Sequence, residues 1–442
     1  MKNLLILAYD FPPYVSVGGL RPYAWYRYLK DYGVYPIVVT RQWGNTYGNE
    51  LDYIAPGESS ETIVEESDYG IIIRTPYNPN LANRLMLKYG SSKFTVVRKT
   101  VTAFYEFAQF LFFIGPKSGL YHGAKKYLKH NHVDAIIATG EPFILFKYAS
   151  ALSKKYAVPW IADYRDPWVQ NKNRSRFMGY WNAFFEKKYL AQVSCVTTVD
   201  EFFKMQIGSL VKRTFCLIPN GYNPEAIEAV ANVPQKNDKL RFAFVGTIYQ
   251  WHPIESVLDE FSKFVVEYSN PNFELNFYGV NCPTDLQNVL EKKFSPLLPY
   301  VTISPKMNND ILLEKLAQHN VLLLFNYYYF TGTKLYDYLA LKRKILLCYS
   351  ADSEAFELKR RFYPYSCVEK TQLNDHVQED CLLKTKSGII VRDKKHLQQV
   401  LRELQDEFDR EKYIACDSVN TEQYSRKQGA KRLADILGTI AS

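Results

Sequence analysis

Four short segments hold charged, hydroxyl and glycine residues that could bind a phosphorylated ligand, and each segment overlaps the end of an apolar run. They are YDFPPYVSVGGLR from Tyr9, ADYRDPW from Ala162, FVGTIYQWHP from Phe244 and YYYFTGTKLYDYLA from Tyr327. In open α/β sheets, ligands bind beyond the carboxyl ends of the strands. The four segments therefore predict a binding site at strand ends.

The last segment places a cation and a carboxylate at the start of a predicted helix. Thr331 or Thr333 could cap a helix that begins with Lys334, and Asp337 follows three residues later. Residues three apart share a helix face. A lysine for phosphate oxygens and an aspartate for ribose hydroxyls would suit a nucleoside diphosphate. A surface ion pair of little energetic weight would give the same pattern.

The first segment contains two adjacent glycines, Gly18 and Gly19, before a predicted helix from Leu20 to Gly33. Glycine lets the backbone approach a ligand closely, and a helix N-terminus presents free N–H groups to an anion. A plain turn is the alternative that the glycine pair alone would favour.

The elements that would position these segments alternate along the whole chain. Continuous apolar runs predict strands buried on both faces, and residues with a helical period predict helices between them. The first half has predicted strands at 3–9, 34–40, 70–75, 133–139, 159–166, 194–199 and 215–221, and helices at 20–33, 144–156, 180–190 and near 201. The second half has predicted strands at 240–247, 273–279, 301–305, 321–327, 344–349 and 388–391, and helices at 257–268, 310–318 and from 334. This alternation predicts an α/β fold with two tandem Rossmann-like, doubly wound domains facing across a cleft.

The chain length and the charge distribution support two domains, which we place at residues 1–220 and 221–421. A chain of 442 residues exceeds the size at which one core keeps growing. Residues 1–220 hold 27 Lys and Arg against 17 Asp and Glu, and the rest hold 28 against 29, so the net charge of +9 arises in the first domain. A basic half commonly faces nucleic acid, anionic lipid or a phosphorylated substrate, although an ordinary soluble surface would also fit. Because the basic residues are dispersed and no recognised module is present, we expect no nucleic-acid partner.

One aromatic-rich segment, residues 94–113, is interrupted by Arg98, Lys99 and Glu106. It is too interrupted to span a bilayer, which needs about 20 mostly apolar residues. It predicts either an interfacial helix in peripheral membrane contact or an ordinary buried helix. The N-terminus is too short and too soon polar for a signal peptide, so we expect a cytoplasmic chain, with the inner face of the membrane as a candidate location.

The residues that bind metals in proteins are not clustered in this sequence. Seven cysteines are scattered without a C-x-x-C pair, which indicates neither a zinc site nor a disulfide framework. No D-x-D cluster or suitably spaced histidine pair is present. We therefore expect no metal and no cofactor.

The motifs, in their order along the chain, resemble those of the retaining glycosyltransferases of family 4, which have the GT-B fold. The resemblance covers nearly the whole chain. It is carried by FPPYVSVGGLRPYAWYRYLKDYG, VDAIIATGEPF, VPWIADYRDPW, IPNGYN, FVGTIYQWHPIESVLDEF and GTKLYDYLALKRKIL. Each motif is weak alone, whereas six in the family's order are a strong signal.

The resemblance implies a nucleotide-sugar donor held mainly by the second domain and a glycan or lipid-linked acceptor held mainly by the first. In the family, the residue matching Lys334 meets the diphosphate and the residue matching Asp337 meets the ribose, while glycine loops of both domains approach the donor. The last helix, within 422–442, would pack back on the first domain. The donor-binding residues implied in this way are Gly18, Gly19, Gly246, Thr247, Thr331, Gly332, Thr333, Lys334 and Asp337.

The sequence departs from the family pattern at two places. Where the family has the first glutamate of an E-x7-E motif, this chain has Tyr329, and Asp337 replaces the second glutamate. The basic pair that follows the second-domain glycine loop is also missing, and only His252 is nearby. Neutralisation of the phosphates would then depend on Lys334, with Arg21 or Arg165 and helix dipoles.

The resemblance implies retention of anomeric configuration without a metal, through a front-face reaction in which the departing diphosphate accepts the acceptor proton. Candidate catalytic residues are Asp163, Arg165 and Asp166 at one strand end, with Glu141 as a candidate for orienting an acceptor hydroxyl. A structural Asp–Arg network is the alternative for the first three.

The sequence thus predicts a retaining, hexosyltransferase-like glycosyltransferase that acts in cell-surface polysaccharide biosynthesis. Two alternatives are a GT-B nucleotide-sugar epimerase, which would need no acceptor, and a non-catalytic GT-B scaffold, which Tyr329 would permit.

Overall fold

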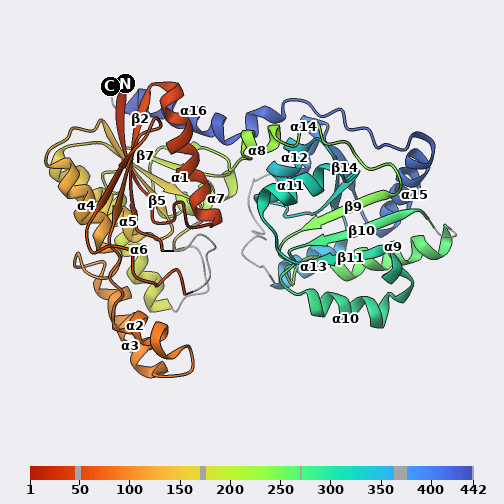
Figure 1. Ribbon diagram of the computed structural model, residues 1–442, viewed down its shortest axis with the longest axis horizontal. Helices are drawn as coiled ribbons and strands as arrows, with labels where there is room; N and C mark the ends of the chain where they lie inside the picture. The colour runs from red at the N-terminus through yellow and green to blue at the C-terminus, as the bar shows by residue number, and fades with distance from the viewer. Residues whose placement is uncertain (45–50, 170–175, 269–270, 363–375, 441–442) are drawn as a thin grey trace. The chain divides into compact units, whose positions relative to one another are not determined.

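The structure is a computed structural model that describes residues 1–44, 51–169, 176–268, 271–362 and 376–440. The chain divides into two compact units. Unit 1 comprises Met1–Asn220 together with Arg426–Ser442, and unit 2 comprises Gly221–Ser425. Each unit is built around one sheet (Figure 1).

The sheet of unit 1 has eight strands in the order β3-β4-β2-β1-β5-β6-β7-β8. All neighbouring strands are parallel except β3, which pairs antiparallel with β4 at one edge. Parallel strands covered on both faces are expected to be almost continuously apolar, as these are. The strands are β1 (Lys2–Leu7), β2 (Val34–Arg41), β3 (Ile63–Glu66), β4 (Ile71–Thr75), β5 (Ala135–Gly140), β6 (Trp160–Tyr164), β7 (Cys195–Thr198) and β8 (Phe215–Leu217).

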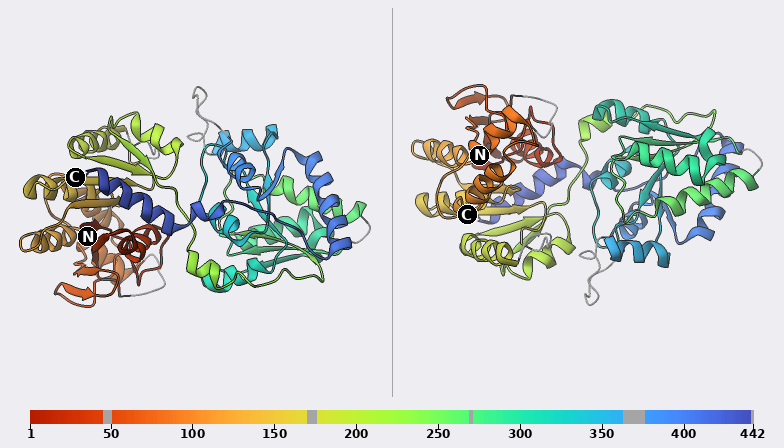
Figure 2. Two further views of the ribbon diagram at one scale, coloured as in Figure 1. Left: turned by 90° about the horizontal axis from the view of Figure 1, so that it is seen from above. Right: turned by 90° about the horizontal axis from the view of Figure 1, so that it is seen from below.

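Helices cover both faces of this sheet. Alternate residues of β1 point to opposite faces, so Leu4 and Ile6 join the core under α1 and α16, whereas Leu5 and Leu7 join the core under α4 and α5. Helix α16 lies alongside α1, although the two are about 400 residues apart in the chain (Figure 2). The helices of unit 1 are α1 (Val17–Tyr28), η1 (Leu29–Tyr32), α2 (Leu81–Tyr89), α3 (Thr95–Ala108), α4 (Ser118–Leu128), α5 (Ile144–Tyr156), α6 (Arg176–Leu190), α7 (Glu201–Gly208) and α16 (Arg426–Ile440).

The sheet of unit 2 has six parallel strands in the order β11-β10-β9-β12-β13-β14. Buried residues form one core on each face of this sheet. The strands are β9 (Leu240–Val245), β10 (Phe273–Tyr278), β11 (Val301–Ser304), β12 (Val321–Phe325), β13 (Lys344–Cys348) and β14 (Gly388–Val391). The helices are α8 (Pro224–Glu228), α9 (Ile254–Glu267), α10 (Pro283–Lys293), η2 (Ser295–Tyr300), α11 (Asn309–Ala317), α12 (Lys334–Leu341), α13 (Ser353–Phe362), α14 (Val377–Thr385), α15 (Lys394–Glu411) and η4 (Thr421–Tyr424).

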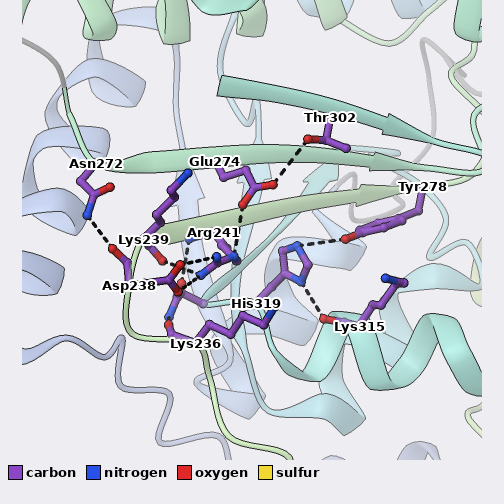
Figure 3. A network of polar contacts seen from close by, with 11 residues as sticks. Lys236, Asp238, Lys239, Arg241, Asn272, Glu274, Tyr278, Thr302, Lys315 and His319 are labelled. Atoms are coloured by element: carbon purple, nitrogen blue, oxygen red, sulfur yellow. Dashed lines mark hydrogen bonds and ion pairs between the residues drawn. The ribbon is translucent and has the colours of Figure 1, made fainter. Parts of the chain in front are cut away.

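A polar network holds the amino ends of the unit 2 strands, at the edge opposite the predicted site (Figure 3). The guanidinium of Arg241 pairs with both carboxylate oxygens of Asp238, at 2.5 and 2.8 Å, and with Glu274 at 3.2 Å. These contacts connect β9 to β10 and hold the pKa of the Asp238 carboxyl below its usual range. Beside them, Nδ1 of His319 donates to the Lys315 carbonyl at 2.7 Å. The network has a structural role at this edge.

The structure corrects one sequence prediction about unit 1 and decides against one of two alternatives for another segment. The first helix begins at Val17 and not at Leu20, so Gly18 and Gly19 lie in its first turn and not in a bare loop. Helix α3 is not an ordinary buried helix, because Ala108 is its sole buried residue. No helix among the described residues is both long enough and apolar enough to cross a membrane.

Candidate functional site

The topology of each sheet defines the strand ends at which a ligand would bind. In unit 1 the chain order reverses at β1, which lies between β2 and β5, and in unit 2 it reverses at β9, which lies between β10 and β12. The crevice at such a switch point is the usual binding place in doubly wound sheets. The segments after β1, β5, β9 and β12 include most of the predicted site residues.

In unit 2, the structure brings Lys334 to the glycine loop that follows β9. The ammonium of Lys334 donates to the Thr247 carbonyl at 3.4 Å and lies 4.4 Å from the centre of the Phe244 ring. A Cβ atom on Gly246 would lie 3.2 Å from Cε of Lys334, and Gly246 has φ of +77°. Both the close approach and the left-handed backbone therefore require glycine there.

Burial changes the charge behaviour of this lysine. It lowers the pKa of Lys334 to about 8, because the ammonium loses hydration and no carboxylate among the described residues offsets the loss. A phosphate group placed beside this ammonium would restore a counter-charge. The position is thus suited to an anionic ligand.

The start of α12 differs from the prediction at its cap. Thr333 is the N-cap residue but makes no side-chain cap, because its backbone is helical (φ −90°, ψ −33°) and not extended as capping requires. The hydroxyl of Thr331 instead lies 2.9 Å from the hydroxyl of Tyr336. Gly332 has φ of +69° and packs against the Tyr327 ring, and Asp337 is half-buried in the first turn.

An aromatic and basic cluster next to Lys334 was only partly visible in the sequence. His252 is buried beside Trp251, and its Nδ1 accepts a hydrogen bond from the Tyr249 amide at 3.3 Å. Burial, together with the charges of Lys334 and Lys359, lowers the pKa of His252 to about 2. The ammonium of Lys359, far along the chain, lies 3.3 Å from the centre of the Trp251 ring. No motif predicted this contact of Lys359.

In unit 1, Asp163 is the centre of a buried hydrogen-bond network. Its side chain is 0% exposed and accepts from Nη2 of Arg21 at 2.8 Å and from Nε at 3.1 Å. The hydroxyls of Thr139 and Thr197 also donate to it, at 2.8 and 2.7 Å. Arg21 in turn donates to the Ile218 carbonyl at 2.6 Å. The contacts favour the structural Asp–Arg network over catalysis for Asp163, and Arg21 replaces Arg165 as its partner.

Arg165 lies instead at the carboxyl ends of β5 and β6. Its guanidinium donates to the carbonyls of Gly140 and Glu141, each at 2.7 Å. Burial raises the pKa of Asp10. The Ser16 hydroxyl donates to the Asp10 carboxylate at 2.7 Å, and this hydrogen bond and the charge of Arg165 oppose the rise. Asp10 was not among the sequence candidates, although it lies just after β1, two residues before the proline pair.

The two glycines of α1 are already engaged within unit 1, Gly18 by close packing and Gly19 by a hydrogen bond of its amide. A Cβ atom on Gly18 would lie 2.5 Å from Oδ2 of Asp10 and would overlap the Arg165 guanidinium. The amide of Gly19 is already used, because it donates to the side-chain oxygen of Ser16, the N-cap of α1, at 3.2 Å. Gly18 thus permits the close packing of α1 on Asp10, and the Gly19 amide serves the helix cap.

A cavity of about 410 Å³ lies in unit 1 next to these residues. It is lined from α3, α6 and the ends of β5 and β6, with Glu141 in its wall. Asn182 lines it as well, and both polar atoms of its carboxamide are buried without a hydrogen-bond partner among the described residues. The predicted Asp166 has an exposed side chain, but partial desolvation of its carboxylate raises its pKa. The charge of Arg165 opposes this rise, and that of Glu141 adds to it.

Comparisons with known proteins give a fold and no family. No protein-family model matches the chain, and no curated protein matches it. Solved structures match over the whole chain. The chain has the GT-B fold.

The matches are distant in sequence. A trehalose-6-phosphate protein from E. coli bound with UDP-2-fluoro glucose is 11% identical, with a TM-score of 0.57 and coverage of 99% of each chain. A sucrose-phosphate synthase from Thermosynechococcus elongatus is 14% identical, with a TM-score of 0.52 and coverage of 100% of this chain and 96% of that one. A UDP-forming α,α-trehalose-phosphate synthase from Burkholderia xenovorans in complex with glucose-6-phosphate is 10% identical, with a TM-score of 0.55 and coverage of 99% and 100%.

Proposed function

We propose that this protein is a glycosyltransferase that takes a sugar from a nucleoside-diphosphate sugar and passes it to a glycan or lipid-linked acceptor. The observation that carries the proposal is the buried Lys334 ammonium at the start of α12, next to the Gly246–Thr247 loop at the switch point of unit 2. Three GT-B proteins with the same fold support it, one of them bound with UDP-2-fluoro glucose. In unit 2 the diphosphate would lie against Lys334 and the ribose against Asp337.

The mechanism that fits this proposal is largely electrostatic. Lys334 and the N-terminal end of α12, which has no side-chain cap, would stabilise the charge that develops on the departing diphosphate. Retention through a front-face path would need no protein nucleophile, and Glu141 would orient the acceptor hydroxyl. We propose that no metal takes part, so that the initial rate should be unchanged by EDTA.

The experiment is a titration of the intact chain with UDP, in which the shift of the melting temperature reports binding. We expect UDP to raise the melting temperature, and Lys334→Ala to weaken UDP binding by about 10-fold to 100-fold, because a hydrogen bond to a charged group contributes about 1.5–3 kcal/mol. Lys292→Ala, at an exposed position of α10 in the same unit, is the matched control and should bind UDP normally. Unchanged UDP affinity in Lys334→Ala would contradict the proposed donor site.

We also propose peripheral contact of unit 1 with an anionic membrane through α3 and α6. The two helices are in contact where the Phe107 ring stacks on the Trp181 ring, with ring centres 3.8 Å apart. Large apolar side chains of both helices are exposed to solvent. Lys99 on α3 and Lys188 on α6 are exposed and could meet lipid phosphates. The exposed apolar residues are Val96, Val97 and Phe104 of α3 and Phe177, Tyr180 and Phe184 of α6.

Flotation with vesicles that contain anionic phosphatidylglycerol tests this contact. The intact chain should float with these vesicles more than with neutral phosphatidylcholine vesicles, and the double variant Phe104→Ser, Phe184→Ser should float less. The control is Val266→Ser with Leu383→Ser, two side chains of unit 2 that are each 66% exposed. Equal flotation of both double variants would refute a role for α3 and α6.

A further inference from the structure

The cavity of unit 1 has the size and the lining of a binding site for a small polar molecule. Its volume of about 410 Å³ lies within the range of about 300–1,000 Å³ that is usual for ligand pockets. One wall is aromatic: the Trp168 ring stacks on Phe143, with centres 5.2 Å apart and planes 6° from parallel, and on Phe110, with centres 5.5 Å apart. Flat aromatic walls suit the apolar C–H face of a sugar ring.

An unpartnered side chain adds a polar feature that packing does not explain. Asn182 is 1% exposed, yet neither its Nδ2 nor its Oδ1 has a hydrogen-bond partner in the part of the chain that the structure describes. Buried polar groups in folded proteins are almost always hydrogen-bonded, and leaving one unpaired is destabilising. A carboxamide presents a donor and an acceptor side by side, which matches neighbouring hydroxyls, or the acetamido group, of a sugar. The free Asn182 therefore points to a ligand in the cavity.

The charges of the described lining residues indicate whether the cavity would bind a sugar phosphate or an uncharged sugar. The cavity is lined by two carboxylates, Glu106 and Glu141, and by Lys117. Burial lowers the pKa of the Lys117 ammonium, and the charges of both carboxylates oppose that fall. The described residues of the wall include two acidic and one basic side chain, so this described part of the wall has a net charge of −1. The nearby guanidinium of Arg165 is directed to two backbone carbonyls. This balance opposes a phosphate dianion and tolerates an uncharged ring.

We infer that the cavity between α3, α6 and the ends of β5 and β6 binds an uncharged sugar ring of the acceptor and excludes sugar phosphates. The inference depends on the glycosyltransferase function proposed above, and it differs from the acceptor class suggested by the Burkholderia xenovorans neighbour, which was solved with glucose-6-phosphate. Asn182 would hold ring substituents, and Phe143 and Trp168 would cover one ring face.

Saturation-transfer NMR on the intact chain tests the inference with methyl glucoside, methyl N-acetylglucosaminide and glucose 6-phosphate as probes. We expect signal from at least one methyl glycoside and none from glucose 6-phosphate at the same concentration. Asn182→Leu should reduce that signal about tenfold, which corresponds to the loss of one or two hydrogen bonds. The same variant should melt at or above the wild-type temperature, because an unpaired buried carboxamide has been replaced by an apolar group of similar shape.

A matched control separates this behaviour from ordinary damage to a core. Asn326 of unit 2 is also buried, but its amide donates to the Tyr349 carbonyl and to Glu379, at 3.2 and 2.9 Å. Asn326→Leu should lower the melting temperature and keep the methyl glycoside signal. A fall in melting temperature for Asn182→Leu that equals that of Asn326→Leu would overturn the inference.

A second variant keeps the test decisive if Asn182→Leu does not fold. Glu106→Gln, at an exposed position of α3, removes one wall carboxylate and should raise glucose 6-phosphate binding relative to methyl glycoside binding. Binding of glucose 6-phosphate alone to the wild type, or no response of selectivity to Glu106→Gln, would refute the uncharged class. The UDP titration distinguishes the two proposals: UDP binding without glycoside binding overturns only the cavity inference, whereas glycoside binding without UDP binding overturns the donor proposal.

Discussion

Replacing Asp163 by asparagine should destabilise unit 1 strongly, because it leaves the buried Arg21 guanidinium without the carboxylate with which it pairs. The change keeps the shape of the side chain, but Thr139 donates to Oδ2 and Thr197 to Oδ1, so one of the two hydroxyls would have to accept from the new amide instead. The change also removes the negative charge opposite the Arg21 guanidinium, which is 7% exposed. Loss of the ion pair is therefore its main effect.

The magnitude follows from the burial of both partners. Breaking a buried ion pair by removing one partner costs about 3–5 kcal/mol, much of it from the charge left unpaired. Each kcal/mol lowers the melting temperature of a domain of this size by about 2–4 °C. We therefore expect the melting transition of unit 1 to fall by about 10 °C.

Calorimetry of the intact chain measures this effect, with Glu255→Gln as the control. Glu255 pairs with Lys293 at 2.5 Å, but both side chains are more than half exposed, and such surface pairs contribute about 0–1 kcal/mol. In the double variant with Arg21→Met, the Asp163→Asn change should cost much less than it does alone. A melting temperature within 2 °C of wild type, accompanied by loss of transferase activity, would refute the structural role and return Asp163 to the catalytic candidates.

Three further predictions concern unit 2. Gly246→Ala should cost about 1 kcal/mol through its positive φ and weaken UDP binding by crowding Lys334, whereas Gly438→Ala, with open space around it in α16, should do neither. UDP affinity measured by calorimetry should fall as the pH rises above 8, because free Lys334 has a pKa of about 8 and loses its charge there, and this fall should be absent in Lys334→Met. Unit 2 should lose stability as the pH falls below about 6.5, because His252 and His319 bind protons there in the unfolded chain. In the folded chain, burial keeps the pKa of His252 at about 2 and that of His319 at about 4, so both stay neutral. The loss should be about 2 kcal/mol per histidine at pH 5, and urea unfolding of His252→Gln and His319→Gln should show a smaller pH dependence; no change between pH 7 and pH 5 would contradict it.

The sequence predicted most strands and the position of their loops, because a strand buried on both faces leaves a continuous apolar run. Helix α5 begins and ends where its periodicity indicated, at Ile144–Tyr156. The edge strand β3 was missed, since its residues are mostly exposed and carry two glutamates. The start of α1 was misplaced because a glycine pair usually indicates a turn, and the cap at Ser16 becomes visible only with its bond to the Gly19 amide.

The sequence predicted which segments contribute to the candidate site better than it predicted the contacts between those segments. The sequence placed Lys334 and the Gly246–Thr247 loop at strand ends, and the structure brings them together because β9 and β12 are neighbours. Contacts between distant segments had no local signal. The Arg21–Asp163 ion pair and the unpaired Asn182 are examples, since the three-dimensional packing decides whether a polar side chain meets a partner.

The position of α16 has a consequence for how the protein is made. Ala430, Leu433 and Leu437 belong to the same core as Leu4 and Ile6, so the part of this sheet face that α16 covers stays exposed on the ribosome until residues beyond 425 have been synthesised. Unit 2 is one continuous stretch and can fold before that moment. The nascent chain would then carry a finished second unit while its first unit still exposes apolar surface to chaperones.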